Sequence, residues 1–200
     1  MLWALGGVLA ASAVWAGGLY AYGDELAAPQ QAYRLPETLC KDFRPAALSR
    51  TVPGLRDFGE ARGEQAQETL DWVVCETTGE SEPTPSGDRV RYVLRVEAER
   101  HKKTDPAVEF GLGIPVLDVS GNSTVSGLGD KAILNTTPAG REPVLRVVDH
   151  EAVFTIRMTA LSLDERGSPA GDVVTDNVDY DEVKYAMIED MRKLMDATRK

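Results

Sequence analysis

The first 23 residues of the chain carry no charged side chain, and every charge lies beyond them. As a helix, residues 2–23 would be about 33 Å long, which matches a hydrocarbon core of roughly 30 Å. Asp24 and Glu25 follow directly and would mark the end of the buried stretch. The sequence therefore predicts a transmembrane signal anchor over residues 1–23, which contacts the lipid bilayer through residues 2–23.

The same segment also has features of a signal peptide. Val14 and Ala16 stand at the two positions where a signal peptidase needs small or apolar side chains, so cleavage would follow Ala16. However, no basic residue precedes the apolar stretch, which continues to Tyr22. We therefore expect a single-pass protein of the cell membrane with its C-terminal part outside the cytoplasm. The alternative is secretion after cleavage.

Small residues recur along the apolar segment at spacings that place them on one face of a helix. They are Gly6, Ala10, Ala13 and Gly17. Close packing of two membrane helices requires such a face. The alternative is an alanine- and glycine-rich apolar segment without a partner helix.

The chain has two cysteines, Cys40 and Cys75, and no C-x-x-C motif. In a cytosolic protein they would be two buried thiols, but behind an export segment an even count predicts a disulfide. The Cys40–Cys75 bridge would tie the first helical segment to the first long strand. This predicts folding on the oxidising side of the membrane.

Composition limits the remaining possibilities. With 42% hydrophobic residues in 200, the chain has enough apolar surface for one folded domain. A formal net charge of −10 argues against a nucleic-acid partner, because phosphate binding needs a positive surface. We expect a linker over residues 24–36 and a folded domain over residues 37–200.

Hydrophobic periodicity predicts the fold of that domain. Apolar and polar residues alternate over residues 89–100, as in a strand with one buried face. Further strands are expected at residues 70–77, 131–136, 143–148 and 152–161, and helices at residues 45–52, 106–112 and 180–198. Residues 59–68 are polar and predict a loop. The short connections require antiparallel pairing. The fold class is α+β: a twisted antiparallel sheet covered by a C-terminal amphipathic helix and a short N-terminal helix, preceded by one transmembrane helix.

No residue pattern predicts catalysis, a metal site or a cofactor. His101 and His150 are the two histidines, and neither has the spacing of a metal-ligand pair. Candidate interaction residues fall in two groups: Arg89, Arg91 and Arg95 on the polar side of one strand, and Gly127, Gly129 and Asp130 in a turn. The first group could meet an anionic headgroup or an acidic partner. The alternatives are a solvated strand face and a tight turn entering a strand.

Several of these features occur together in a known type of domain. They are Cys40 before a short helix, Cys75 beside a strand with Trp72, the turn at residues 125–132, and a closing amphipathic helix. Over residues 36–195 the chain resembles small exported domains of unknown function from actinobacteria, often lipoproteins, which are related in shape to PsbP-like α+β folds. The resemblance implies an extracytoplasmic, non-enzymatic domain that binds proteins or cell-envelope ligands. The lipoprotein members have a lipidated cysteine where this chain has its apolar segment.

These features predict a membrane-tethered extracytoplasmic domain that binds another envelope or membrane protein and has no catalytic activity. The alternative is a carrier for an apolar cell-envelope ligand such as a lipid. Met187, Met191 and Met195 form a row on the last helix that would suit such a pocket. The same row would also suit an ordinary hydrophobic core.

Overall fold

The computed structural model describes residues 30–85, 87–110, 121–136, 142–170 and 178–200. Within these residues, no helix combines the length and the apolar character needed to cross a membrane. The anchor expected at residues 1–23, with its small-residue face at Gly6, Ala10, Ala13 and Gly17, lies outside the described residues, as do residues 24–29 of the linker.

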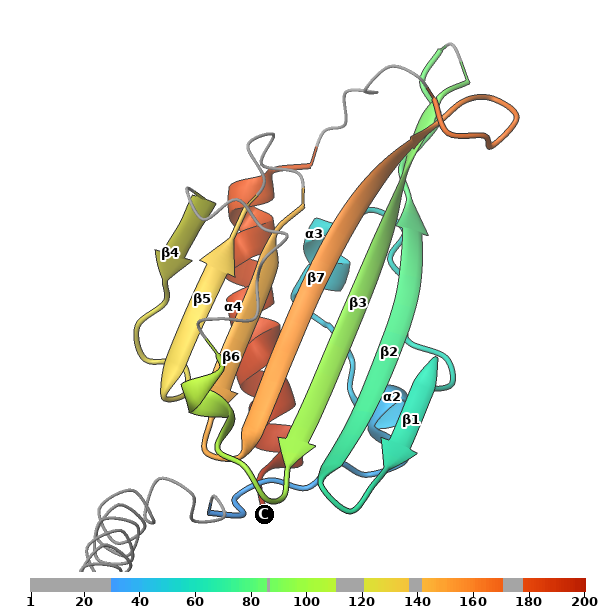
Figure 1. The fold of residues 1–200 in the computed structure, drawn as a ribbon. Helices are drawn as coiled ribbons and strands as arrows, with labels where there is room; N and C mark the ends of the chain where they lie inside the picture. Colours follow the sequence, from blue (N-terminus) through green and yellow to red (C-terminus); the bar gives the residue numbers. More distant parts are fainter. Residues whose placement is uncertain (1–29, 86, 111–120, 137–141, 171–177) are drawn as a thin grey trace, which may run out of the picture.

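The described residues form one seven-stranded antiparallel sheet with α-helices on one face and a short 3₁₀ turn on the other (Figure 1). The strands are β1 (Gly63–Ala66), β2 (Leu70–Glu80), β3 (Arg89–His101), β4 (Asn122–Thr124), β5 (Lys131–Asn135), β6 (Val144–Asp149) and β7 (Ala152–Leu163). Their order across the sheet is β1-β2-β3-β7-β6-β5-β4. The helices are α2 (Leu39–Asp42), α3 (Leu48–Thr51) and α4 (Tyr180–Thr198), with a 3₁₀ turn, η2, at Pro106–Val108. The predicted α+β class is confirmed.

Alternation along β3 separates the two faces of the sheet. Tyr92, Leu94 and Val96 are at most 1% exposed and point toward the helices, whereas the residues between them point away. The neighbours continue this buried face, since Val96 lies opposite Cys75 on β2 and Ile156 on β7. The α-helices thus bury one face, as is usual for an antiparallel sheet, whereas the other face is covered in part, where Phe110 packs on Val148 and Val153.

Helix α4 covers the buried face behind β5, β6 and β7 (Figure 1). Its N-terminus is capped by Asp179, whose carboxylate accepts hydrogen bonds from the backbone N–H of Asp181 (2.8 Å) and Glu182 (3.3 Å). Its apolar stripe is fully packed: Met187 and Met191 are 0% exposed and Met195 is 5% exposed. The methionine row is therefore part of the hydrophobic core.

The predicted disulfide between Cys40 and Cys75 is present and joins α2 to β2. Both cysteines are buried, and the bridge spans a sequence separation of 35 residues. On the chain-entropy model, a loop of this length stabilises the folded state by about 4 kcal/mol. The bridge thus holds against the sheet the described segment before β1, whose helices α2 and α3 have four residues each.

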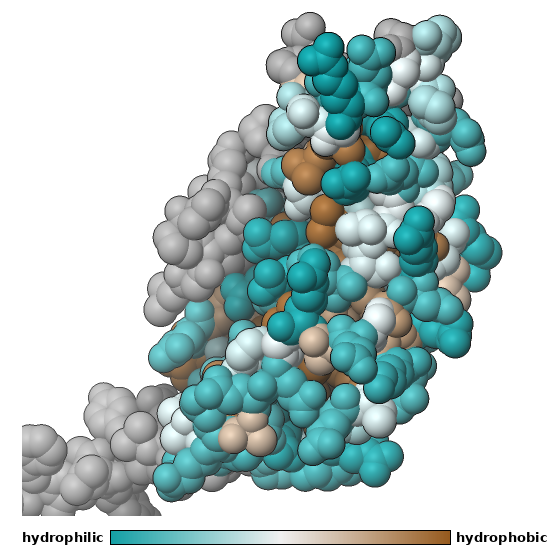
Figure 2. All heavy atoms as spheres, turned by 90° about the vertical axis from the view of Figure 1, so that its right-hand side faces the viewer, coloured by the Kyte–Doolittle hydropathy of each residue, from teal (hydrophilic) through white to brown (hydrophobic). Residues whose placement is uncertain are grey.

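The main error in the expected layout concerns residues 59–68. They were expected to form a loop, but Gly63–Ala66 form the edge strand β1, paired with β2. The indole of Trp72 lies over Gly63, where a Cβ would come within 2.5 Å of the ring, and it donates to the Gln65 side chain at 3.0 Å. The strand is polar because it lies at the edge of the sheet, and the surface on this side is mostly hydrophilic (Figure 2).

Other boundaries differ by less. The three-residue strand β4 and the helix α2 were not expected, and the short helix expected from Pro45 begins at Leu48. Of the helix expected at 106–112, the structure describes residues 106–110, and among these Pro106–Val108 form the 3₁₀ turn η2. The long elements agree closely, and α4 has the expected bounds.

Candidate binding surface on the open sheet face

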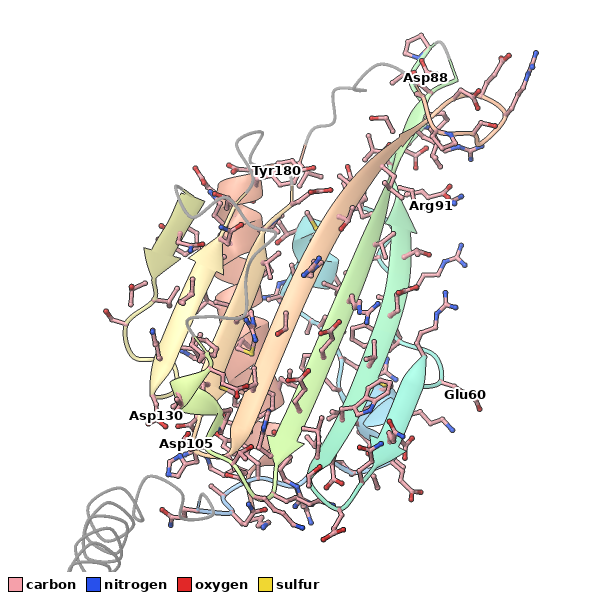
Figure 3. The ribbon with its side chains drawn as sticks, viewed as in Figure 1. Glu60, Asp88, Arg91, Asp105, Asp130 and Tyr180 are labelled. Carbon is pink, nitrogen blue, oxygen red and sulfur yellow. A yellow bond between two sulfur atoms is a disulfide. The ribbon has the colours of Figure 1, made fainter. Side chains whose placement is uncertain are left out.

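The open face is the side of the sheet that points away from α4. As the alternation predicted, Arg89, Arg91 and Arg95 all project from β3 onto this face. Arg91 points outward near the end of β3 that is uppermost in Figure 3. Their side chains are 37–46% exposed. The three arginines therefore lie on one accessible surface.

These three arginines have acidic partners close by. Glu80 on β2 lies 3.5 Å from Arg89 and 2.7 Å from Arg91, and the hydrogen bond from Arg91 is the main reason that the pKa of Glu80 is lowered. Arg95 forms an ion pair with Glu97, two residues along the same strand. Much of the positive charge of this stripe is thus balanced within the sheet.

The strand register reveals a second set of cations that the sequence did not indicate. Arg157 on β7 lies directly opposite Arg95 on β3. Arg146 on β6 faces Thr155, so it is the diagonal neighbour of Arg157. Lys131 on β5 faces Val148 and is in turn the diagonal neighbour of Arg146. We call Lys131, Arg146, Arg157 and Arg95 the cationic row, because they cross four neighbouring strands of the open face in one line.

An aromatic ring lies against one end of this row. Phe110, which follows η2, is 2% exposed and packs on Val148 and Val153. The Arg146 guanidinium lies 5.3 Å from the centre of the ring, and the Lys131 ammonium lies 5.8 Å from it. Cation–π contacts of this kind hold the two side chains in place without neutralising them.

Three members of the row lack acidic partners. Among the residues that the structure describes, Lys131, Arg146 and Arg157 form no ion pair. Arg157 and Arg95 are like charges directly opposite each other, a cross-strand pairing that destabilises a sheet. The chain has a net charge of −10, yet these three cations have no acidic partner among the described residues. Local arrangements that do not favour stability are often found at functional surfaces.

The row borders a hollow in the open face. This groove has a volume of about 510 Å³ and is lined by Glu76, Val93, Arg95, Glu97, Arg157 and Thr159. A smaller hollow of about 340 Å³ lies beside Arg91 and Glu80. Arginine presents a planar fork of N–H donors that fits carboxylate and phosphate groups, so the larger groove has the chemistry to hold an anion.

The second predicted group, Gly127, Gly129 and Asp130, forms a tight turn before β5. Gly127 and Gly129 have positive φ angles of 72° and 59°. A Cβ on Gly129 would lie 2.6 Å from a Val147 methyl group, so both its conformation and its contacts require glycine. Asp130 accepts a hydrogen bond from the backbone N–H of His150 at 2.8 Å. These three residues shape the turn and its contact with the β6–β7 hairpin, and the structure does not bring them together with the three arginines of β3 in one site.

A polar cluster surrounds the two-residue loop of that hairpin, His150 and Glu151. Donor atoms of Asp130, Asp149 and His150 lie within 4.8 Å of one another, close enough to ligate one metal ion. However, Asp149 already accepts from the Tyr33 hydroxyl and from Arg199 (2.8 Å), and its other oxygen lies 3.1 Å from the His150 ring. These hydrogen bonds account for the cluster, which we interpret as structural. We call the contacts among Tyr33, Asp149 and Arg199 the tie.

The tie joins the two ends of the described chain to the sheet. Burial is the main cause that raises the pKa of Tyr33 to about 12, so its hydroxyl keeps the proton that it donates to Asp149. The Arg199 guanidinium donates to the same hydroxyl at 2.9 Å, and this bond is the main reason that the pKa of Arg199 is raised. Glu151 is fully buried and accepts from the Tyr33 backbone N–H at 2.8 Å.

The buried carboxylate of Asp190 was also missed in the sequence. Asp190 of α4 is 0% exposed and accepts hydrogen bonds from the backbone N–H of Ala47 (3.0 Å) and Leu48 (2.8 Å), at the start of α3. Burial raises its pKa. The signal was an aspartate within the apolar stripe of an amphipathic helix. Its role is to join two helices.

Comparisons with known proteins assign no relative. No family model matches the sequence, and searches of curated proteins and of solved structures found no match. The resemblance to exported actinobacterial domains of the PsbP-like type therefore stays a prediction.

Proposed function

We propose that the chain is a membrane-tethered extracytoplasmic domain that binds another envelope or membrane protein through its open sheet face and has no catalytic activity. Residues 2–23 would hold it in the bilayer. The uncharged N-terminal segment and the Cys40–Cys75 disulfide support export, because disulfides persist mainly in oxidising compartments.

The observation that carries the proposal is the cationic row. Its members cross four strands, and three of them have no acidic partner among the described residues. A face adapted only to the stability of this domain would pair such charges, since opposite charges across strands stabilise a sheet and like charges destabilise it. Cations without acidic partners beside a groove, such as Arg157, are instead typical of a surface that is completed by a partner.

The carrier hypothesis has less support. It placed an apolar ligand beside Met187, Met191 and Met195, between α4 and the sheet. These side chains are 0–5% exposed and pack against strand residues in the main core cluster. Met187 and Met191 thus already have the contacts that a ligand would provide.

Site-specific photo-crosslinking in native cells tests the proposal. A photoreactive amino acid replaces Thr159, which lines the groove, or Tyr185, which is 75% exposed on α4 and serves as the control. We expect a discrete crosslinked protein from position 159 and none from position 185. Equal crosslinking from both positions, or none from position 159, would contradict the proposal. The N-terminal sequence of the mature protein, read from the same cells, shows whether the anchor is retained.

A further inference from the structure

We propose that the cationic row binds an extended acidic peptide segment of the partner protein, with carboxylates at alternate positions of that segment. This inference rests on the proposed function, because it names the chemistry of the partner at the same surface. Four observations lead to it: the spacing of the row, the missing counter-charges, the fixed orientation at one end, and the distribution of acids on the rest of the open face.

The spacing of the row fits an extended chain. Lys131, Arg146 and Arg157 are successive diagonal neighbours on β5, β6 and β7. Diagonal neighbours on adjacent strands lie about 7–8 Å apart. In an extended peptide, side chains on one face repeat about every 6.7 Å. Carboxylates at every second residue of a peptide that crosses the strands would therefore meet successive cations.

The row is ready to receive anions. Phe110 holds Arg146 and Lys131 through its ring, so little side-chain freedom is lost there on binding. At the other end, Arg157 and Arg95 stand opposite each other at the groove. Arg95 already binds Glu97, whereas Arg157 has no acidic partner among the described residues, so a carboxylate beside Arg157 would form the charge-assisted hydrogen bonds that this guanidinium lacks.

The acids of the open face favour a narrow partner over a membrane surface. Glu76 and Glu97 line the groove, and Glu99 is 40% exposed farther along β3. A flat anionic lipid surface would be attracted to the row but would also be repelled by these carboxylates. A single extended peptide that follows the row meets these acids only at its Arg95 end, where Glu97 is already paired with Arg95.

Binding of the full chain, in detergent micelles, to synthetic peptides tests the inference. The probe is a labelled peptide in which Asp and Thr alternate, and the control peptide has Asn in place of Asp. The variants Arg146→Gln and Arg157→Gln change the row, and Arg166→Gln, on an exposed turn, is the matched control. We expect each change in the row to weaken binding about fivefold, as loss of one solvent-exposed ion pair would. We expect Arg166→Gln to leave the affinity unchanged and added salt to weaken binding.

Three outcomes would overturn the inference: equal affinity for the Asn peptide, equal affinity of Arg157→Gln and Arg166→Gln for the Asp peptide, or binding to anionic phospholipid vesicles without binding to the peptide. Unfolding of each variant in urea, with a midpoint no lower than that of the natural chain, excludes loss of the fold as a cause. The proposed function can survive this failure, since a crosslink from position 159 would still identify a protein partner that uses different chemistry.

Discussion

The two faces of the sheet are built from the same strands but follow different rules. On the face toward α4, neighbouring side chains such as Leu94 and Ile156 are apolar and at most 1% exposed. On the open face, the same strands place Arg95 opposite Arg157. The first face lowers the free energy of the domain by removing apolar surface from water, whereas the second retains a repulsion that a partner could relieve. Under the proposed function, one strand would serve folding on one side and binding on the other.

The largest expected effect on the free energy of unfolding comes from a comparison of two adjacent residues of β3, one on each face of the sheet. Leu94→Ala should lower the free energy of unfolding by about 3 kcal/mol, because Leu94 is 1% exposed in the core and truncation leaves a cavity. Val93→Ala, on the groove side, should cost less than about 1 kcal/mol. Urea unfolding followed by tryptophan fluorescence measures both. Similar losses for the two variants would mean that the open face is also covered.

A paired arginine offers the second comparison. Arg100 and Lys102 both bind the Asp71 carboxylate, and Arg100 also donates to the Tyr33 carbonyl at 3.3 Å. Burial raises the pKa of Asp71, but the bonds from Lys102 and Arg100 outweigh it and hold that pKa below its ordinary value of 3.8. Asp71→Asn should therefore lower the free energy of unfolding by about 2 kcal/mol at neutral pH.

The pH dependence of this effect has a definite sign. A carboxylate whose pKa is lowered in the folded state stabilises that state above its unfolded pKa, and the stabilisation is lost as the pH falls through the folded pKa. The difference between the natural chain and Asp71→Asn should thus be constant above pH 3.8 and shrink below it. Unfolding curves at several pH values check this. A difference that grows on acidification would contradict the assignment of Asp71 as an ionised partner.

The smallest effect concerns the unpaired arginine. Arg157→Gln removes the positive charge opposite Arg95, so it should leave the free energy of unfolding unchanged or raise it by up to about 0.5 kcal/mol. The same urea titration measures it, with Arg166→Gln as the control. A loss of more than about 1 kcal/mol would show that Arg157 stabilises the domain itself.

Local patterns predicted much of the fold. The alternation of β3 and the apolar stripe of α4 each repeat with one clear period, and both elements were found with nearly the expected bounds. Edge strands β1 and β4 are short and polar, with four and three residues, so neither has an apolar period to detect. Their pairing with longer neighbours decides their structure.

The candidate surface was only partly predictable. Arg89, Arg91 and Arg95 share one strand, so their common face follows from alternation alone. Lys131, Arg146 and Arg157 lie on three strands, and their alignment depends on the register between β5, β6 and β7. The tie among Tyr33, Asp149 and Arg199 likewise joins residues that are up to 166 positions apart. Such contacts have no local signal in a single sequence.

The pairing of the two ends also determines how the domain would respond to a mechanical load. Tyr33 and Arg199 form an antiparallel bridge, and the backbone N–H groups of Arg34 and Lys200 bond to Thr198 and Ala32. Tension that arrives through the N-terminal segment would therefore meet the last turn of α4 before it reaches the middle of the sheet. A tag fused after Lys200 would lie beside Ala32 and Tyr33, where the N-terminal segment reaches the domain. It would therefore interfere sterically with the expected attachment to the membrane.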